Sequence, residues 1–174
     1  LEHVNTLYRE SQAQYEDARK ELIKAKDIGV ESLARKLHLD DALTHIMKES
    51  EAEAGSIYVP SNKEGHLIFL SIQPLNQQTS KLKLTRIPIS QSLAGKCFVT
   101  GKPFVVSNAK QNPEHYEKAD NITGVTTEDT LQLPLRFQGQ TIGVLQLMNK
   151  EGRAKFGEDD LKRIDTAAEE IARR

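Results

Sequence analysis

Residues 130–148 read TLQLPLRFQGQTIGVLQLM and carry the clearest fold signal in the chain. Two largely apolar runs, 130–137 and 141–148, flank the short polar segment Gln138-Gly139-Gln140. Two such runs around a short glycine-containing turn are typical of a β-hairpin. We therefore expect the fold to be built on an antiparallel sheet that contains this pair of strands.

Segments on both sides of the hairpin supply further strand and helix patterns. Strand patterns occur at 56–59, 66–73, 81–87 and 104–107, and helical patterns at 41–53, 90–100 and 158–174. Asp40 is the predicted cap of the first of these helices, and Gly55 is the residue expected to end it. The polar stretch 108–129 predicts a long loop with short helical turns. Together they predict an α+β fold, an antiparallel sheet of about five or six strands with helices on one side.

Residues 1–38 predict a long helical stalk ahead of a folded domain at 39–174. Apolar or small residues recur at alternating steps of three and four, at Leu1, Val4, Tyr8, Ser11, Tyr15, Ala18, Leu22 and Ala25. This heptad spacing is typical of a coiled coil, which would make the protein a homodimer through its N-terminal and C-terminal helices. The alternative is an amphipathic helix that lies on its own domain.

Charge and composition exclude several classes of function. The chain has 24 basic and 25 acidic residues, a balance that argues against a nucleic-acid-binding surface. Its apolar runs are far shorter than the ~20 residues that span a bilayer. The single cysteine, Cys97, cannot form an internal disulfide, which favours a reducing compartment. We expect a cytoplasmic fragment of a longer chain that binds neither nucleic acid nor membrane.

The sequence contains no signature of catalysis or metal binding. A nucleophile elbow, a zinc-protease motif, a phosphate-binding loop and a dinucleotide-binding glycine motif are all missing from it. The five histidines are scattered without metal-ligand spacing. Cys97 is interpreted as a small buried residue, with a reactive thiol as the alternative. We therefore expect no enzymatic activity in this chain, and neither a metal nor a covalently bound cofactor.

A candidate binding site lies between residues 90 and 149. The first turn of the helix predicted at 90–100 reads Ser92-Leu93-Ala94-Gly95, so its small side chains and unpaired backbone N–H groups could hold an anion. The loop that follows carries Asp120, Thr123 and Thr127, short polar side chains that can bond sugar and phosphate oxygens. The alternative is that these side chains only cap turns within the loop.

Three sequence blocks in this region resemble one known family. Residues 93–103 read LAGKCFVTGKP, residues 120–127 read DNITGVTT, and residues 143–150 read GVLQLMNK. In order and spacing they are similar to signature blocks of the GAF domain, specifically the branch found in cyclic-nucleotide phosphodiesterases and bacterial adenylyl cyclases. The resemblance covers roughly residues 40–172. It implies a six-stranded GAF sheet and a regulatory sensor that binds a cyclic nucleotide.

The same resemblance implies a set of ligand contacts. They fall at Ser56, Ile72, Gln73, Leu93, Ala94, Asp120, Thr123, Thr127 and Gln146. The residues at 93 and 94 would bind the cyclic phosphate through backbone N–H groups, and the two threonines would bind phosphate and sugar oxygens. Gln73 stands where guanine-preferring relatives often carry Asp. Its amide offers one donor and one acceptor, which favours cAMP over cGMP. The alternative is that Gln73 is an ordinary solvent-facing residue at a strand end.

A dispersed motif of the same branch falls at Asn149, Lys150, Phe156 and Asp160, with Leu161 in place of the final Glu. The resemblance implies a supporting role for these residues, with Lys150 and Asp160 paired. It also implies that closure of the 108–129 loop over ligand acts through the flanking helices on an output domain such as a nucleotide or diguanylate cyclase. One alternative is a GAF domain that binds another ligand, or none, and serves as a dimerisation module. Another is a free methionine sulfoxide reductase, which needs a relay of cysteines that one cysteine cannot provide.

Overall fold

The structure is a computed structural model that describes residues 38–173 of the 174-residue chain. Apart from His38, the predicted stalk lies outside the described residues, and the coiled-coil hypothesis lies outside them too. Among the helices within 38–173, none combines the length and the apolar character that crossing a membrane requires.

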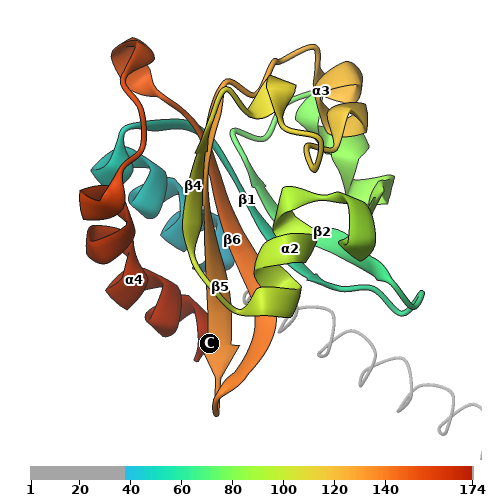
Figure 1. Ribbon diagram of the computed structural model, residues 1–174, viewed down its shortest axis with the longest axis vertical. Helices are drawn as coiled ribbons and strands as arrows, with labels where there is room; N and C mark the ends of the chain where they lie inside the picture. Colours follow the sequence, from blue (N-terminus) through green and yellow to red (C-terminus); the bar gives the residue numbers. More distant parts are fainter. Residues whose placement is uncertain (1–37, 174) are drawn as a thin grey trace, which may run out of the picture. The chain divides into compact units, whose positions relative to one another are not determined.

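A six-stranded antiparallel sheet forms the centre of the described domain (Figure 1). The strand order is β3-β2-β1-β6-β5-β4. The strands are β1 (Ala52–Pro60), β2 (His66–Gln73), β3 (Arg86–Pro88), β4 (Phe104–Ser107), β5 (Asp129–Phe137) and β6 (Gln140–Lys150). The main helices are one over residues 38–50, α2 (Leu93–Thr100), α3 (Glu117–Thr123) and α4 (Glu158–Ala172). Four short 3-10 helices complete the fold: η1 (Thr79–Leu84), η2 (Ile89–Gln91), η3 (Ala109–Gln111) and η4 (Glu151–Arg153).

The predicted hairpin is the β5–β6 pair at the middle of the sheet. Its register runs from Thr130 opposite Met148 to Phe137 opposite Gln140, with one irregularity near the turn. Side chains alternate between the two faces along each strand. Leu131, Leu133 and Leu135 therefore share one face, while Gln132 and Pro134, which alternate with them, lie on the other.

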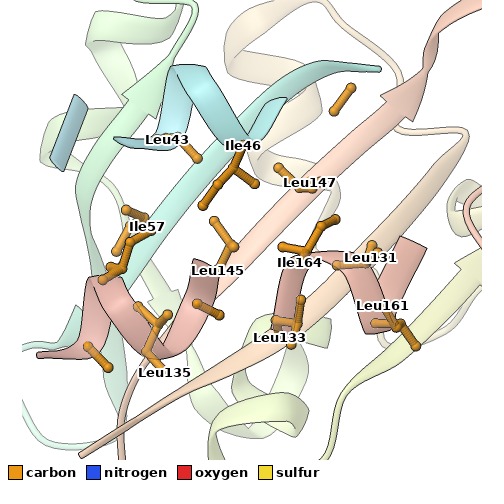
Figure 2. Close-up of a cluster of buried hydrophobic side chains, with 14 of the residues drawn as sticks. Leu43, Ile46, Ile57, Leu131, Leu133, Leu135, Leu145, Leu147, Leu161 and Ile164 are labelled. Carbon is orange, nitrogen blue, oxygen red and sulfur yellow. The ribbon is translucent and has the colours of Figure 1, made fainter. Parts of the chain in front are cut away.

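Helices cover both faces of the sheet, not one as predicted (Figure 1). The helix over 38–50 and α4 pack on one face, where Leu43, Ile46, Leu145, Leu147 and Ile164 belong to a single buried cluster (Figure 2). On the opposite face, α2 and α3 lie over a second cluster. The prediction failed because polar residues such as Thr130 and Gln132 look like a solvent-facing row, although both are fully buried.

The segment expected as a strand at 81–87 is mostly helical. Residues 79–84 form η1, and only the last part of the segment pairs with β2 as β3. The Asn76 side-chain oxygen accepts hydrogen bonds from the backbone N–H groups of Gln78 and Thr79, each at 2.9 Å, which starts a turn. This local turn outweighs the Lys/Leu alternation, and as a result Leu82 is buried while Leu84 is 92% exposed.

The helix over 38–50 ends three residues before its predicted end, and Gly55 lies inside β1. Glu51 adopts a left-handed backbone conformation, with φ 56°, and this reverses the chain into the strand. A Cβ at Gly55 would meet Leu43 Cδ1 at 3.0 Å and Met47 at 3.1 Å. Gly55 therefore permits close packing of the helix on β1 and does not serve as a helix stop.

Candidate functional site

A cavity of about 240 Å³ lies between one face of the sheet and the elements α2, α3 and η1. Its floor comes from β1, β2, β5 and β6, and its walls come from the first turn of α2 and the loop between β4 and β5. We call residues 108–128, which include α3, the flap. Most of the lining is apolar, with a small number of polar side chains that could orient a ligand.

All nine residues predicted to contact ligand line this one cavity. They are Ser56, Ile72, Gln73, Leu93, Ala94, Asp120, Thr123, Thr127 and Gln146. They come from β1, β2, α2, the flap and β6, which are far apart in the sequence. The structure therefore brings the predicted residues together, and their binding of a ligand stays a prediction.

The register of the sheet explains how three of these residues meet on the cavity floor. Ser56 in β1 pairs with Ile72 in β2 on one side and with Gln146 in β6 on the other. Residues directly opposite one another in a ladder project from the same face. Ser56 is 1% exposed, and its Oγ makes no hydrogen bond to any described residue. A buried hydroxyl without a partner is costly, so this atom offers a ligand an unused hydrogen-bonding group.

The first turn of α2 forms the wall above this floor. Ser92 caps the helix, because its Oγ accepts a hydrogen bond from Gly95 N at 3.0 Å and donates one to Pro88 O at 2.6 Å. Leu93 and Ala94 follow Ser92 in this first turn, where an α-helix supplies their N–H groups with no internal acceptor. Both residues line the cavity, as the anion-site hypothesis requires.

A single carboxylate holds the flap together. Asp120 accepts hydrogen bonds from Thr127 N at 2.9 Å and from Thr127 Oγ1 at 2.8 Å, and its Oδ2 lies 3.0 Å from His115 Nε2. Partial burial raises the pKa of Asp120, but the bonds from His115 and Thr127 outweigh that effect and leave the pKa below its ordinary value. Asp120 therefore stays ionised and stabilises the flap by three contacts.

These contacts change the roles expected for the two threonines. The Thr127 hydroxyl donates to Asp120, and Thr123 Oγ1 donates to Ala119 O at 3.1 Å. In this conformation both hydroxyl protons are donated within the flap, so neither can be donated to a phosphate oxygen of a ligand. The two hydroxyl oxygens keep lone pairs that could accept a hydrogen bond from a ligand. Donation to a phosphate by either residue would need a rotation of its side chain.

The predicted supporting residues connect β6 to α4. Lys150 Nζ lies 2.9 Å from Asp160 Oδ1 and 3.1 Å from Oδ2, so the expected ion pair is present. Asp160 also accepts a hydrogen bond from Gly157 N at 2.9 Å, at the beginning of the helix. Burial raises the pKa of Asp160, but the bonds from Lys150 and Gly157 lower it by more, so the pKa lies below its ordinary value.

Asn149 and Asp129 tie the end of the flap to the same region. The Asn149 side chain accepts from Glu128 N at 2.8 Å and donates to Thr126 O at 3.0 Å. The buried Asp129 accepts from Phe156 N at 3.0 Å, and its second oxygen accepts from the backbone N of residue 150 at 3.3 Å. Sequence reasoning missed Asp129, since it was taken as the last residue of the loop.

Sequence reasoning also missed several aromatic and polar lining residues. Tyr58 and Phe69 face each other across β1 and β2, with ring centroids 4.7 Å apart, and both line the cavity. Burial raises the pKa of the Tyr58 hydroxyl well above its ordinary value, and the negative charge of Asp120 acts in the same direction. His115 and Tyr116 line the cavity from the flap. The sequence does offer one signal for these two residues, because they are adjacent ring-bearing side chains in an otherwise polar loop.

Within residues 38–173, no group of three His, Cys, Asp or Glu side chains is arranged to hold a metal ion. Cys97 is fully buried, and burial raises the pKa of its thiol to about 12, against a smaller lowering effect of Arg136. The thiol is therefore protonated near neutral pH and poorly nucleophilic. This agrees with its interpretation as a packing residue.

Comparison with known proteins identifies the family. Residues 38–173 match the family model described as the GAF domain. A protein named "Probable 3',5'-cyclic phosphodiesterase pde-5", from Caenorhabditis elegans, is 34% identical over 68 residues, which span 39% of this chain and 9% of that protein.

Two solved structures share the fold at low sequence identity. The GAF domain of a phosphoenolpyruvate-protein phosphotransferase from Coxiella burnetii gives a TM-score of 0.68 at 19% identity, covering 85% of this chain and 88% of that one. A type II free methionine-R-sulfoxide reductase from Thermoplasma acidophilum gives 0.64 at 16% identity, with 82% and 92% covered. With its six-stranded antiparallel sheet and a family match that extends over all the described residues, the chain belongs to the GAF domain family.

Proposed function

We propose that this GAF domain binds a cyclic purine mononucleotide. Like GAF domains generally, it is a regulatory or sensor module and not a catalyst. The observation that carries the proposal is the cavity of about 240 Å³ on which all nine predicted contact residues converge. The partial match to a cyclic phosphodiesterase supports the choice of ligand class.

The walls of the cavity suit the parts of such a ligand. The amides of Leu93 and Ala94 at the beginning of α2 offer donors to the cyclic phosphate, and a helix N-terminus favours negative charge. The unpartnered Ser56 hydroxyl lies on the floor nearby in the same cavity. Tyr58, Phe69 and the other apolar lining residues offer a surface against which a purine ring can pack.

We further propose that the ligand is cAMP in preference to cGMP. Gln73 lies at the end of β2 and lines the cavity. Its amide can donate one hydrogen bond and accept another, which matches the adjacent acceptor and donor on adenine. The neighbouring N1–H and N2–H groups of guanine are two donors, which a carboxylate at this position would accept better than an amide.

The proposed signal passes from the flap to α4. Asp120 holds the flap residues together through its bonds to Thr127, so ligand would act by changing how firmly the flap is held. Asn149 bonds the end of the flap, and the next residue, Lys150, pairs with Asp160 on α4. A ligand shifts such an equilibrium only by its different affinity for the two states. We place the domain upstream of an output domain, such as a nucleotide or diguanylate cyclase, in a longer chain, on the strength of the sequence resemblance.

A thermal-shift assay with matched variants tests the proposal. A ligand at about 100 times its dissociation constant adds roughly 2.7 kcal/mol to the free energy of unfolding. We expect that shift with cAMP, a smaller one with cGMP, and none with cAMP in Ala94→Leu, whose added side chain would occupy the cavity. Val99→Leu, on the exposed side of the same helix, should respond like the wild type. No shift with either nucleotide in the wild type would favour the alternative of a dimerisation module.

A further inference from the structure

The cavity contains an unusual balance of charged side chains for a site that is to hold an anion. No lysine or arginine is among the described residues that line it. Glu53 and Asp120 both line it and carry negative charge when ionised. His115 is the one lining residue within the described chain that can carry a positive charge. The amides of α2 alone would therefore have to offset two carboxylates.

His115 is held in a defined orientation beside this cavity. Its side chain is 8% exposed, and its Nε2 lies 3.0 Å from Asp120 Oδ2. The pKa of Asp120 is lowered, so its carboxylate is ionised and can only accept hydrogen bonds. The nitrogen facing it must then carry the proton, which assigns the tautomer from the partner. The other ring nitrogen, Nδ1, makes no hydrogen bond to any of the described residues.

We propose that His115 supplies the positively charged contact for the anionic group of the ligand, through Nδ1–H of its protonated ring. The inference rests on the proposed function only in that the ligand is an anion. In the neutral ring Nδ1 is an acceptor and repels a phosphate oxygen, whereas in the protonated ring it is a donor. Protonation therefore changes both the charge and the hydrogen-bonding polarity at this point of the cavity wall.

The other charged groups around His115 do not perform this role. Asp120 is its direct partner, and Tyr58 and Glu53 line the same cavity from β1. The neighbouring Glu114 is paired with Lys96 on α2 at 2.7 Å, so that lysine is occupied outside the cavity lining. Protonation of the ring adds a positive charge to this part of the cavity wall, so the affinity for an anionic ligand should rise as the pH falls.

Titration calorimetry with the full chain, at several values between about pH 5.5 and 8.5, tests the inference. The probes are cAMP, which keeps one negative charge throughout, and adenosine, which is uncharged. We expect cAMP to bind roughly tenfold more tightly at the acid end, and adenosine to bind with no such trend. In His115→Gln the cAMP profile should be flat, at the affinity of the wild type at high pH. His45→Gln, an exposed histidine of the 38–50 helix, is the matched control and should keep the wild-type profile.

Each outcome separates this inference from the proposed function. A flat wild-type profile, or a pH trend that survives in His115→Gln, overturns the role of His115 while cAMP binding stands. If cAMP fails to bind but cGMP or AMP binds with a trend that depends on His115, the choice of cAMP is wrong and the inference stands. If no anion binds at any pH, both are wrong.

A second measurement guards against a misfolded variant. NMR of the wild-type protein labelled at the imidazole nitrogens should show a ligand-induced change at His115 Nδ1 with cAMP and not with adenosine. The same change with both probes would mean that the ring responds to the nucleoside and not to the phosphate.

Discussion

Lys150→Met tests the link between β6 and α4 most sharply. The side chains of Lys150 and Asp160 are 15% and 6% exposed, and two N–O distances of 2.9 and 3.1 Å join them. Removing the lysine leaves a buried carboxylate without its main counter-charge, and breaking one side of a buried ion pair costs about 3–5 kcal/mol. Because Gly157 N still donates to the carboxylate, we expect the lower end of that range, about 3 kcal/mol, in the free energy of unfolding.

Urea unfolding followed by circular dichroism measures this loss, and a double variant controls for it. In Lys150→Met with Asp160→Asn, the buried charge is gone and the amide oxygen can still accept from Gly157 N. We expect the double variant to recover about 2 kcal/mol relative to the single one. A loss below about 1 kcal/mol in the single variant, or no recovery in the double, would refute the reasoning.

The same pair predicts a pH dependence of stability. The folded-state pKa of Asp160 is depressed, so its contribution is present above the ordinary carboxyl value near ~4 and is lost as the pH falls through the folded-state pKa. The wild type should therefore lose more stability than Lys150→Met when both are unfolded at decreasing pH from about 5 to 2. Parallel curves for the two proteins would contradict this assignment.

Three further changes test the cavity and the core. In Gly95→Ala the new Cβ would clash with the backbone oxygen of Ile89 in η2, so the beginning of α2 must move. We expect the free energy of unfolding in urea to fall by about 2–3 kcal/mol. Gly157→Ala, whose Cβ meets nothing within 4 Å, is the control and should change it little. Thr127→Ala removes the 2.8 Å hydrogen bond to Asp120 and should lower the free energy of unfolding by about 1–2 kcal/mol. It should also weaken the binding of cAMP measured by calorimetry. Unchanged affinity would show that the flap does not act on the ligand. Leu145→Ala empties a fully buried position and should lower the free energy of unfolding by about 3 kcal/mol in the same urea assay, whereas a loss under about 1 kcal/mol would mean that the core around it collapses.

Local patterns were enough to predict the central hairpin and the closing helix. Strands β5 and β6 carry alternating side chains around Gln138-Gly139-Gln140, and α4 repeats apolar residues at helical spacing. Both signals depend on residues that are close in the sequence, so they can be read without knowing which strands or helices pack against them. The short helix predicted at 90–100 is present as α2, although it begins at Leu93, after its cap at Ser92.

Other features depend on packing that no local pattern reports. Gly55 was misread as the end of a helix because the close packing of Leu43 against it is not visible in the residues around it. Thr130 and Gln132 are both fully buried, which their polar character alone does not indicate. In each case the deciding contact comes from an element outside the segment itself.

The candidate site divides in the same way. The family resemblance was sufficient to nominate its residues, because such a pattern is recognised position by position along the chain. Only the tertiary structure decided that Asp120 is committed to Thr127 and His115, that Ser56 is left without a partner, and that no lysine or arginine among the described residues reaches the cavity. Hydrogen-bond partners and local charge are relations between distant segments, and they exist only once the sheet, α2 and the flap have been brought together.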